Sequence, residues 1–261
     1  MNDEIRNFAR GAWAGMLSRT ITAPLDLYKL QLQNPFMPSK NLDHVIQRDG
    51  FRHLWKGNLS NCLRIMPNQA INLMVYERTR EKMNISSPST SSFISGIVAG
   101  SISTLSTYPL ETLRVRLALQ DYASKYRGIW DAVRSTPKRH WYQGAGICMI
   151  GFPLFNAISF SVHSRMKKYF NLSIYSEIVR GGIAGSTAIT FTYPTDLLRR
   201  RMQLQGFNDN IPEYKNLRHA IRQIYLAEGI RGFYRGLGMC YLKIFPTTGI
   251  YFYIIRKTRL N

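Results

Sequence analysis

The chain has 261 residues, and 35 Lys or Arg against 15 Asp or Glu give it a formal net charge of +20. Such an excess suits an anionic partner: nucleic acid, anionic lipid or a small anionic ligand. The mean hydropathy is −0.20, and the sequence has no uninterrupted apolar run of about 20 residues, as a simple spanning helix would show. Taken alone, this favours a soluble protein. A helix bundle around a watery cavity is not excluded, because ionisable side chains can face such a cavity.

The cysteines and histidines form no pattern typical of catalysis or metal binding. Cys62, Cys148 and Cys240 fit neither a disulfide framework nor a zinc spacing. Each precedes a proline by five or six residues, so we expect packing residues at equivalent repeat positions. No Walker glycine loop occurs, and the five histidines are scattered. We therefore expect no enzyme, no cofactor and no metal. Met1–Glu4 carries acids and no apolar core, so we expect no cleavable signal peptide.

Six long helices are expected, and three of the connections end in an aromatic residue, a basic or polar residue and glycine. At a helix start, such a segment places a ring at the membrane–water boundary and offers backbone amides to a phosphate. In the first repeat we expect a helix over about 4–33 with a kink at Pro24, a short amphipathic piece over 42–48 and a helix over about 58–83. A Ser/Pro linker over 86–92 leads to the second repeat, with a helix over about 93–120 and another from Gly144 to about 170. In the third repeat we expect a helix over about 176–205, a long loop that starts around 206–212 and is closed by 228–236, and a sixth helix that reaches about 259.

One motif recurs three times, as Pro24–Lys29, Pro109–Arg114 and Pro194–Arg199, and its prolines are 85 residues apart both times. Each copy reads proline, any residue, acid, two residues, base. On a helix the acid and the base share one face, and the proline kinks the helix there. A single copy could be a surface ion pair beside a turn. Three copies in register predict three acids and three bases in one ring.

These motifs resemble those of the mitochondrial carrier family over essentially the whole chain. The resemblance implies an all-α membrane protein with six transmembrane helices in a pseudo-threefold barrel. It would form one domain over 1–261, with repeats of about 1–88, 89–172 and 173–261. It further implies a multi-pass carrier in the inner membrane of a mitochondrion or related organelle, alternating its cavity between cytosol and matrix. The implied matrix-side gate consists of Asp26, Lys29, Glu111, Arg114, Asp196 and Arg199, with Gln31 bracing it.

The family's cytoplasmic gate is only partly present in this sequence. Tyr76, Glu77 and Arg80 match its aromatic–acid–base pattern on the second helix. The fourth helix keeps the base, Lys167, and the sixth keeps Arg259, but Ser164 and Arg256 stand where acids belong. The resemblance therefore implies a weak second gate. The second repeat also lacks the Glu-Gly pair before Tyr142 and has Gln143 for a base, so its matrix-side helix is expected to be short.

For the substrate, the second helix looks most like that of the ADP/ATP carriers. It shares Gly-Asn-Leu at the start, an arginine before the proline, and Gln-Ala-x-Asn. The alignment of the fourth helix is uncertain by one residue, because Pro153 falls one position early. Arginines grip phosphate bidentately, and an aromatic ring can stack on adenine. The substrate contacts implied are Arg19, Arg64, Asn68, Asn72, Gly151, Phe152, Phe155 and Lys243.

Other interpretations stay open for these residues. The cations could reach for lipid headgroups, and Phe155 could be a packing residue. The third repeat reads Arg199–Leu204 as Arg-Arg-Arg-Met-Gln-Leu, where the ADP/ATP carriers have three methionines, and Ser18–Asp26 looks closer to the ATP-Mg/phosphate carriers. Coenzyme A or thiamine pyrophosphate also fits. We expect a monomer that binds a small anion, an adenine nucleotide, and membrane lipid including cardiolipin. The remote alternative, a basic nucleic-acid-binding protein, lacks a known reading motif.

Overall fold

The computed structural model describes residues 13, 15–36, 46–47, 50–83, 88–120, 126–166, 174–208, 211–244 and 246–247. Within these ranges every regular element is a helix. Residues 15–21 and 237–244 are also helical. The elements are α2 (Ala23–Gln33), η1 (Phe51–Trp55), α4 (Asn58–Lys82), α5 (Pro88–Leu119), α6 (Ile129–Ser135), η2 (Lys138–His140), α7 (Ala145–Met166), α8 (Ile174–Gln203) and α9 (Leu217–Gly232).

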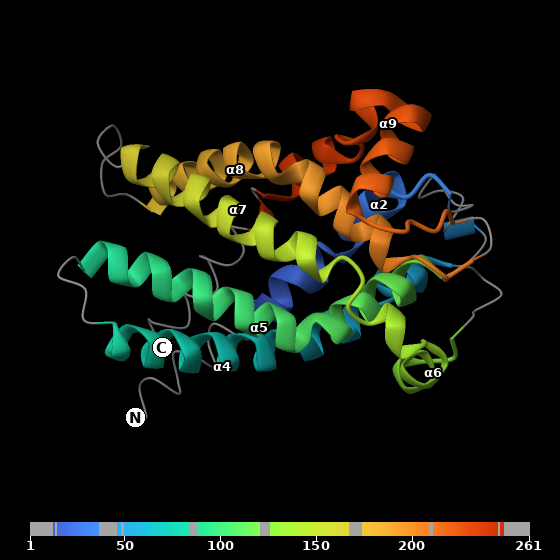
Figure 1. Ribbon diagram of the computed structural model, residues 1–261, viewed down its shortest axis with the longest axis horizontal. Helices are drawn as coiled ribbons and strands as arrows, with labels where there is room; N and C mark the ends of the chain where they lie inside the picture. Colours follow the sequence, from blue (N-terminus) through green and yellow to red (C-terminus); the bar gives the residue numbers. More distant parts are fainter. Residues whose placement is uncertain are drawn as a thin grey trace.

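The long helices are arranged as pairs. In Figure 1, α4 runs along α5 and α7 runs along α8, while α6 and α9 lie toward one end of these helices. The helices that carry the repeated motif, α2, α5 and α8, each touch the other two. Three segments that are far apart in sequence therefore converge, as a threefold repeat requires.

The repeat prolines act differently in the three copies. Thr22 forms a turn between the helical residues 15–21 and α2, and Pro24 lies in the first turn of α2, where a missing N–H is tolerated. Pro109 and Pro194 lie inside α5 and α8, which continue past them. The helix is therefore interrupted beside the proline in the first copy only; a kink, which was the expectation at each proline, needs no such interruption.

Three glycines lie where a long helix begins after each motif helix: Gly57 before α4, Gly144 before α7 and Gly236 before the helical residues 237–244. We call these glycines the packing glycines, and the helices that follow them the even-numbered spans. Gly57, Gly144 and Gly236 have φ of 81°, 81° and 85°, which a residue with a Cβ rarely adopts. A Cβ on Gly57 would lie 2.9 Å from the Arg114 carbonyl oxygen, and one on Gly144 would lie 3.0 Å from that of Arg199. On Gly236 it would lie 3.4 Å from the Lys29 carbonyl oxygen. Each glycine therefore lets the start of its helix approach the backbone of the basic residue in the next repeat's motif.

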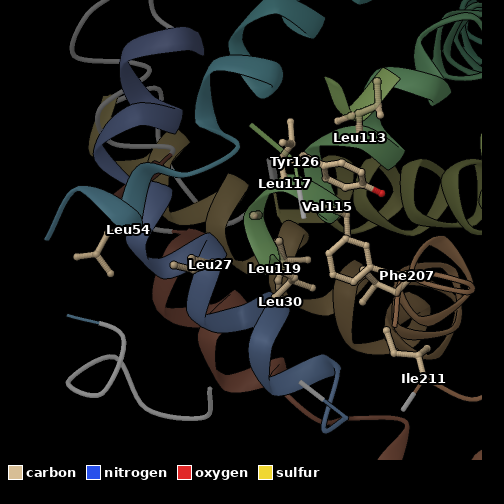
Figure 2. Packing of buried hydrophobic residues seen from close by; sticks show 13 residues of the cluster. Leu27, Leu30, Leu54, Leu113, Val115, Leu117, Leu119, Tyr126, Phe207 and Ile211 are labelled. Carbon is tan, nitrogen blue, oxygen red and sulfur yellow. The ribbon is translucent and has the colours of Figure 1, made fainter. Parts of the chain in front are cut away.

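The largest cluster of buried apolar residues joins these parts. Leu27 and Leu30 of α2 meet the last turns of α5, and Tyr126, Phe207 and Ile211 close the cluster from the connecting segments, as Figure 2 shows. Because burial of a large apolar side chain contributes about 1.5–3 kcal/mol, this cluster holds the motif-bearing helix ends together.

The structure corrects three expectations about the chain. A 16-residue helix, α9, occupies much of the segment expected as a long loop, and α5 begins at Pro88, inside the expected linker. The cysteines are not equivalent: Cys148 and Cys240 each follow the packing glycine by four residues, whereas Cys62 follows it by five. As expected for the second repeat, its short helix α6 has 7 residues, fewer than the 16 of α9 in the third repeat.

Two segments of the described chain, Thr90–Leu119 and Lys138–Met166, are long and apolar enough to cross a membrane. The other long helices, α4 and α8, carry charged residues such as Arg64 and Asp196 in their interiors. Hydropathy alone therefore finds only part of a bundle whose charges face inward.

Arg201 ties α9 to the rest of the fold. Its guanidinium contacts both carboxylate oxygens of Glu228, at 2.5 and 3.0 Å, and its Nε donates to the Gln33 carbonyl at 3.0 Å. Arg235 adds a third hydrogen bond to Glu228, at 2.9 Å. Burial alone would raise the pKa of Glu228, but the hydrogen bonds and charges of Arg201 and Arg235 hold this pKa below its ordinary value.

We predict that Glu228→Gln lowers the thermal stability of the detergent-solubilised protein at pH 7, by roughly 1–2 kcal/mol for the weakened charged hydrogen bonds. Because the pKa of Glu228 is lower in the folded than in the unfolded chain, its contribution is present at neutral pH and disappears as the pH falls through that lowered pKa. Melting curves from pH 7 to pH 3 measure this. Glu81→Gln, at an exposed residue of α4, is the control. A gap between wild type and Glu228→Gln that stays constant over this range would contradict the prediction.

Candidate functional site

Three acids and three bases form a closed circle where α2, α5 and α8 meet. Asp26 pairs with Arg114 at 3.1 Å, Glu111 with Arg199 at 3.1 Å, and Asp196 with Lys29 at 2.7 Å. In every case the acid of one repeat pairs with the base of the next repeat, and the third repeat returns to the first. We call these six residues the acid–base ring. The six side chains of the ring are between 3% and 24% exposed.

The ring is not electrically symmetric, because Glu111 collects most of the cations. Its carboxylate lies 2.6 Å from Arg200, 2.9 Å from Arg64 and 3.1 Å from Arg199, and its side chain is 3% exposed. The Arg64 Nε is close to the Glu111 Oε2 without the alignment of a hydrogen bond, so this contact is an ion pair. Arg200 was not among the expected site residues. Its sequence signal is the run of three arginines in the third repeat.

Asp196 has the loosest surroundings of the three acids. Its side chain is 24% exposed, against 12% for Asp26 and 3% for Glu111. Apart from Lys29, it accepts a hydrogen bond from the Gln33 amide at 3.2 Å and lies 3.7 Å from Arg200. The glutamine whose side-chain amide contacts the ring is therefore Gln33, which donates to Asp196, and not Gln31. The side-chain oxygens of both glutamines are buried without a hydrogen-bond partner. Gln31 lies two residues away, on another face of α2.

Two buried tyrosines contact basic residues of the ring. Tyr108 and Tyr193 directly precede the repeat prolines and are fully buried. Their hydroxyls donate to the backbone carbonyls of Gln143 and Arg235, at 2.9 and 2.7 Å. Arg199 lies over the Tyr108 ring and Lys29 over the Tyr193 ring, with 5.4 and 5.7 Å to the centroids. Sequence reasoning did not assign them a role, although both stand at the same repeat position.

Two of the expected phosphate-binding cations point at the ring. Lys243 Nζ lies 2.5 Å from Asp26 Oδ1, and Arg64 pairs with Glu111 as described above. Arg19 donates to the Asn61 side-chain oxygen at 3.1 Å, although it lies near enough to Arg64 and Arg114 for their charges to act on it. The structure thus brings Arg64 and Lys243 together with the ring, while Arg19 contacts a neutral partner on α4.

The three expected contacts of α7 line a pocket of about 190 Å³ beside the ring. Gly151, Phe152 and Phe155 face it from α7, and Lys29 and Asp196 face it from the ring. Phe152 also packs tightly against α5, since a Cβ on Gly100 would overlap its ring. Phe155 is therefore the aromatic side chain with more freedom to meet a ligand.

The two asparagines of α4 turn toward α5. Asn68 donates to Thr107 Oγ1 at 3.0 Å, and Asn72 to Ser103 Oγ at 3.4 Å. Asn72 also lines a larger cavity of about 750 Å³ between α4, α5, α7 and α8, together with Asn156 and Ser159. Of these two implied substrate contacts, Asn72 therefore lines a cavity, whereas Asn68 bonds to the neighbouring helix.

The second gate is described only in its first repeat. Glu77 and Arg80 are exposed near the end of α4, and Tyr76 is half-buried. Lys167 and Arg259 lie outside the described residues. Among the ion pairs between described residues none involves Glu77 or Arg80.

Sequence comparison identifies the architecture to which this ring belongs. The family model described as "Mitochondrial carrier protein" matches residues 3–87, 85–174 and 170–260. The chain belongs to the mitochondrial carrier family. The three matches confirm the threefold repeat, and with it the all-α, six-span pseudo-threefold barrel. The carrier is therefore a multi-pass protein of the mitochondrial inner membrane and a transporter, not an enzyme.

Several curated relatives of the carrier are named as adenine nucleotide transporters. The chain is 31% identical to the chloroplastic/mitochondrial adenine nucleotide transporter BT1 of Arabidopsis thaliana, over 96% of this chain and 68% of the relative. It is 31% identical to the mitochondrial adenine nucleotide transporter ADNT1 of the same plant, over 93% of this chain and 82% of the relative. It is 29% identical to a human mitochondrial adenyl nucleotide antiporter over 97% of this chain, and spans 57% of that relative.

We predict a ranking of the three acids by the stability that each lends to the closed ring. Glu111→Gln leaves the largest set of cations without a partner, and breaking a buried ion pair costs roughly 3–5 kcal/mol. Asp26→Asn should cost less, and Asp196→Asn least, because Asp196 is the most exposed acid. Melting temperatures of the three purified variants test this order. Equal losses, or the largest loss at Asp196, would show that the asymmetry has no energetic weight.

A second prediction separates the two glutamines of α2. Gln33→Met removes the hydrogen bonds to Asp196 and Tyr193 at nearly constant volume, and should destabilise the protein by about 1–2 kcal/mol. Gln31→Met is the matched control: it replaces a buried oxygen without a partner by an apolar group, which is neutral or stabilising. Thermal unfolding of both variants decides the matter, and a larger loss for Gln31→Met would restore Gln31 as the brace.

Proposed function

We propose that the carrier exchanges adenine nucleotides across the inner membrane by alternating access, with the acid–base ring as its matrix-side gate. The observation that carries the proposal is the charge at the ring. Six cations, Lys29, Arg64, Arg114, Arg199, Arg200 and Lys243, meet three acids there. The three charges in excess suit a di- or triphosphate, and would hold its phosphate end at the cavity floor.

The base of a nucleotide would lie against α7. The pocket of about 190 Å³ offers Phe155 and Phe152 beside Lys29 and Arg199, so a ring and a phosphate could be bound within one site. Base–aromatic stacking contributes about 1–3 kcal/mol. The small Gly151 leaves room beside it. Arg19 and Asn72 would contact the same ligand outside the ring.

The gate assignment follows from which end carries ion pairs. Charged groups that are buried and paired hold the helices together, yet part when a ligand competes for them. Glu77 and Arg80, at the far end of α4, are exposed. With Tyr76, and with Lys167 and Arg259, they would form the cytoplasmic gate, which has too few acids for three ion pairs. The structure then corresponds to a carrier closed at the matrix side.

The relatives support a nucleotide and leave its form open. Those named above are adenine nucleotide transporters or antiporters, and the sequence around Asp26 resembles the ATP-Mg/phosphate type. A carrier of ATP-Mg and phosphate, coenzyme A or thiamine pyrophosphate would use the same phosphate-binding cations. The lipid partner, cardiolipin, and the monomeric state belong to the proposal as well.

The decisive test is exchange in liposomes that contain the purified carrier. We expect labelled ADP to enter ADP- or ATP-loaded vesicles faster than vesicles loaded with coenzyme A, thiamine pyrophosphate or phosphate alone. Arg64→Gln should lower the exchange by roughly 10- to 100-fold, since a charged hydrogen bond contributes about 1.5–3 kcal/mol. Arg222→Gln, at an exposed residue of α9, is the control. Exchange of another phosphate compound without exchange of ADP would refute the substrate assignment.

A further inference from the structure

The three even-numbered spans differ at one position that faces the ring. Counting seven residues from each packing glycine leads to Arg64 from Gly57, to Lys243 from Gly236, and to Gly151 from Gly144. The chain thus has two long cationic side chains and one glycine at equivalent places in its three repeats.

The two cations make equivalent contacts. Arg64, in the first repeat, lies 2.9 Å from Glu111, the acid of the second repeat. Lys243, in the third repeat, lies 2.5 Å from Asp26, the acid of the first repeat. Both therefore contact the acid of the following repeat, which also pairs with a base of the ring. At these two vertices of the ring the acid is held from two sides.

The third vertex lacks such a cation. Gly151 faces the third repeat, where a Cβ would lie 2.5 Å from Thr195 Oγ1, so no longer side chain fits without a shift. Asp196, the acid of this vertex, is the most exposed of the three, and the pocket of about 190 Å³ opens beside it. The second repeat thus differs from the other two in that it has no long side chain at this position and has a pocket beside it.

We propose that Arg64 and Lys243 are gating residues as well as phosphate ligands, so that substrate binding and release of the ring compete for the same two cations. This inference rests on the proposed function. In the closed ring the two side chains neutralise Glu111 and Asp26. A phosphate that takes them over removes one support from each acid, and the ring is left with the contacts between α2, α5 and α8.

Such competition supplies the energetic link that an exchanger needs. A ligand shifts a conformational equilibrium only by binding one state better than the other. While the ring is closed, Arg64 and Lys243 are engaged by carboxylates. Once the ring opens, both cations are free to bind phosphate oxygens, so the phosphate favours the state in which the acids are released. Without a phosphate, the two cations return to the acids and keep the ring closed.

Arg19 provides a matched comparison within the same cavity. It is a cation of the proposed phosphate site, but it donates to Asn61 and contacts no ring acid within hydrogen-bonding distance. A residue that only binds substrate should behave like Arg19. A residue that also holds the gate should behave differently when no substrate is present.

The experiment compares Arg64→Gln, Lys243→Gln and Arg19→Gln in two measurements. In liposomes loaded with labelled ADP, efflux is followed without external counter-substrate. We expect the first two variants to raise the absolute rate of this efflux by about tenfold, within the usual range of coupling between sites, and Arg19→Gln to leave that rate unchanged, whatever each variant does to the rate of exchange. In detergent without substrate, the first two should lower the melting temperature and Arg19→Gln should not.

A double variant makes the second measurement specific. In an Asp26→Asn background, Lys243→Gln should lower the melting temperature much less than in the wild type, because its partner has already lost its charge. Unchanged efflux together with additive effects of the two substitutions would overturn the inference. If wild-type carrier fails to exchange ADP, the nucleotide proposal fails, and the substrate-free melting measurements still decide whether Arg64 and Lys243 hold the ring.

Discussion

A carboxylate buried between helices needs a cation beside it, and this requirement organises the carrier. Asp26, Glu111 and Asp196 are each supplied by a base from another repeat, so no repeat can satisfy its own acid in the same way. Glu111 and Asp196 also have ion pairs within their own repeats, but these are longer, at 3.7 Å. All three of the closer ring pairs therefore form together only when the three motif helices converge. Packing glycines at the starts of the even spans and a shared apolar cluster then set the helices at the distance that these ion pairs need.

Beyond this symmetric frame, the repeats differ in ways that fit a transporter of anions. Extra cations gather on Glu111, and Arg200 and Arg64 are added to a ring that is already neutral without them. A purely structural ring would gain little from this surplus, because unbalanced buried charge is unfavourable. A ligand with several negative charges would balance it. The surplus thus links the stability of the empty carrier to the charge of what it transports.

Sequence reasoning reached the parts of the site that repetition exposes. Asp26, Glu111 and Asp196, with their bases, follow from one motif seen three times, and the family match confirms the repeat. Features that break the repeat were harder to predict. Gln33 and Gln31 are both polar residues on α2, and only the rotation of the helix places the former beside Asp196. The helix α9 has its own caps but follows a Gly- and Asn-containing stretch that reads as a loop. Arg64 and Lys243 were expected in the cavity, yet their engagement with the acids depends on side-chain directions that spacing does not determine.

Gly151 makes the contacts around the ring unequal at its three corners. The acids at two of its corners are each contacted by a cation from an even-numbered span, whereas Asp196, the acid of the third corner, is contacted by Lys29, Gln33 and, at 3.7 Å, Arg200 of its own helix. The closed ring is therefore supported unevenly from its surroundings. Arg64 and Lys243 each reach across to a motif helix, whereas α7 meets the ring with a glycine and leaves a pocket there. A threefold-symmetric widening of the ring is therefore not expected.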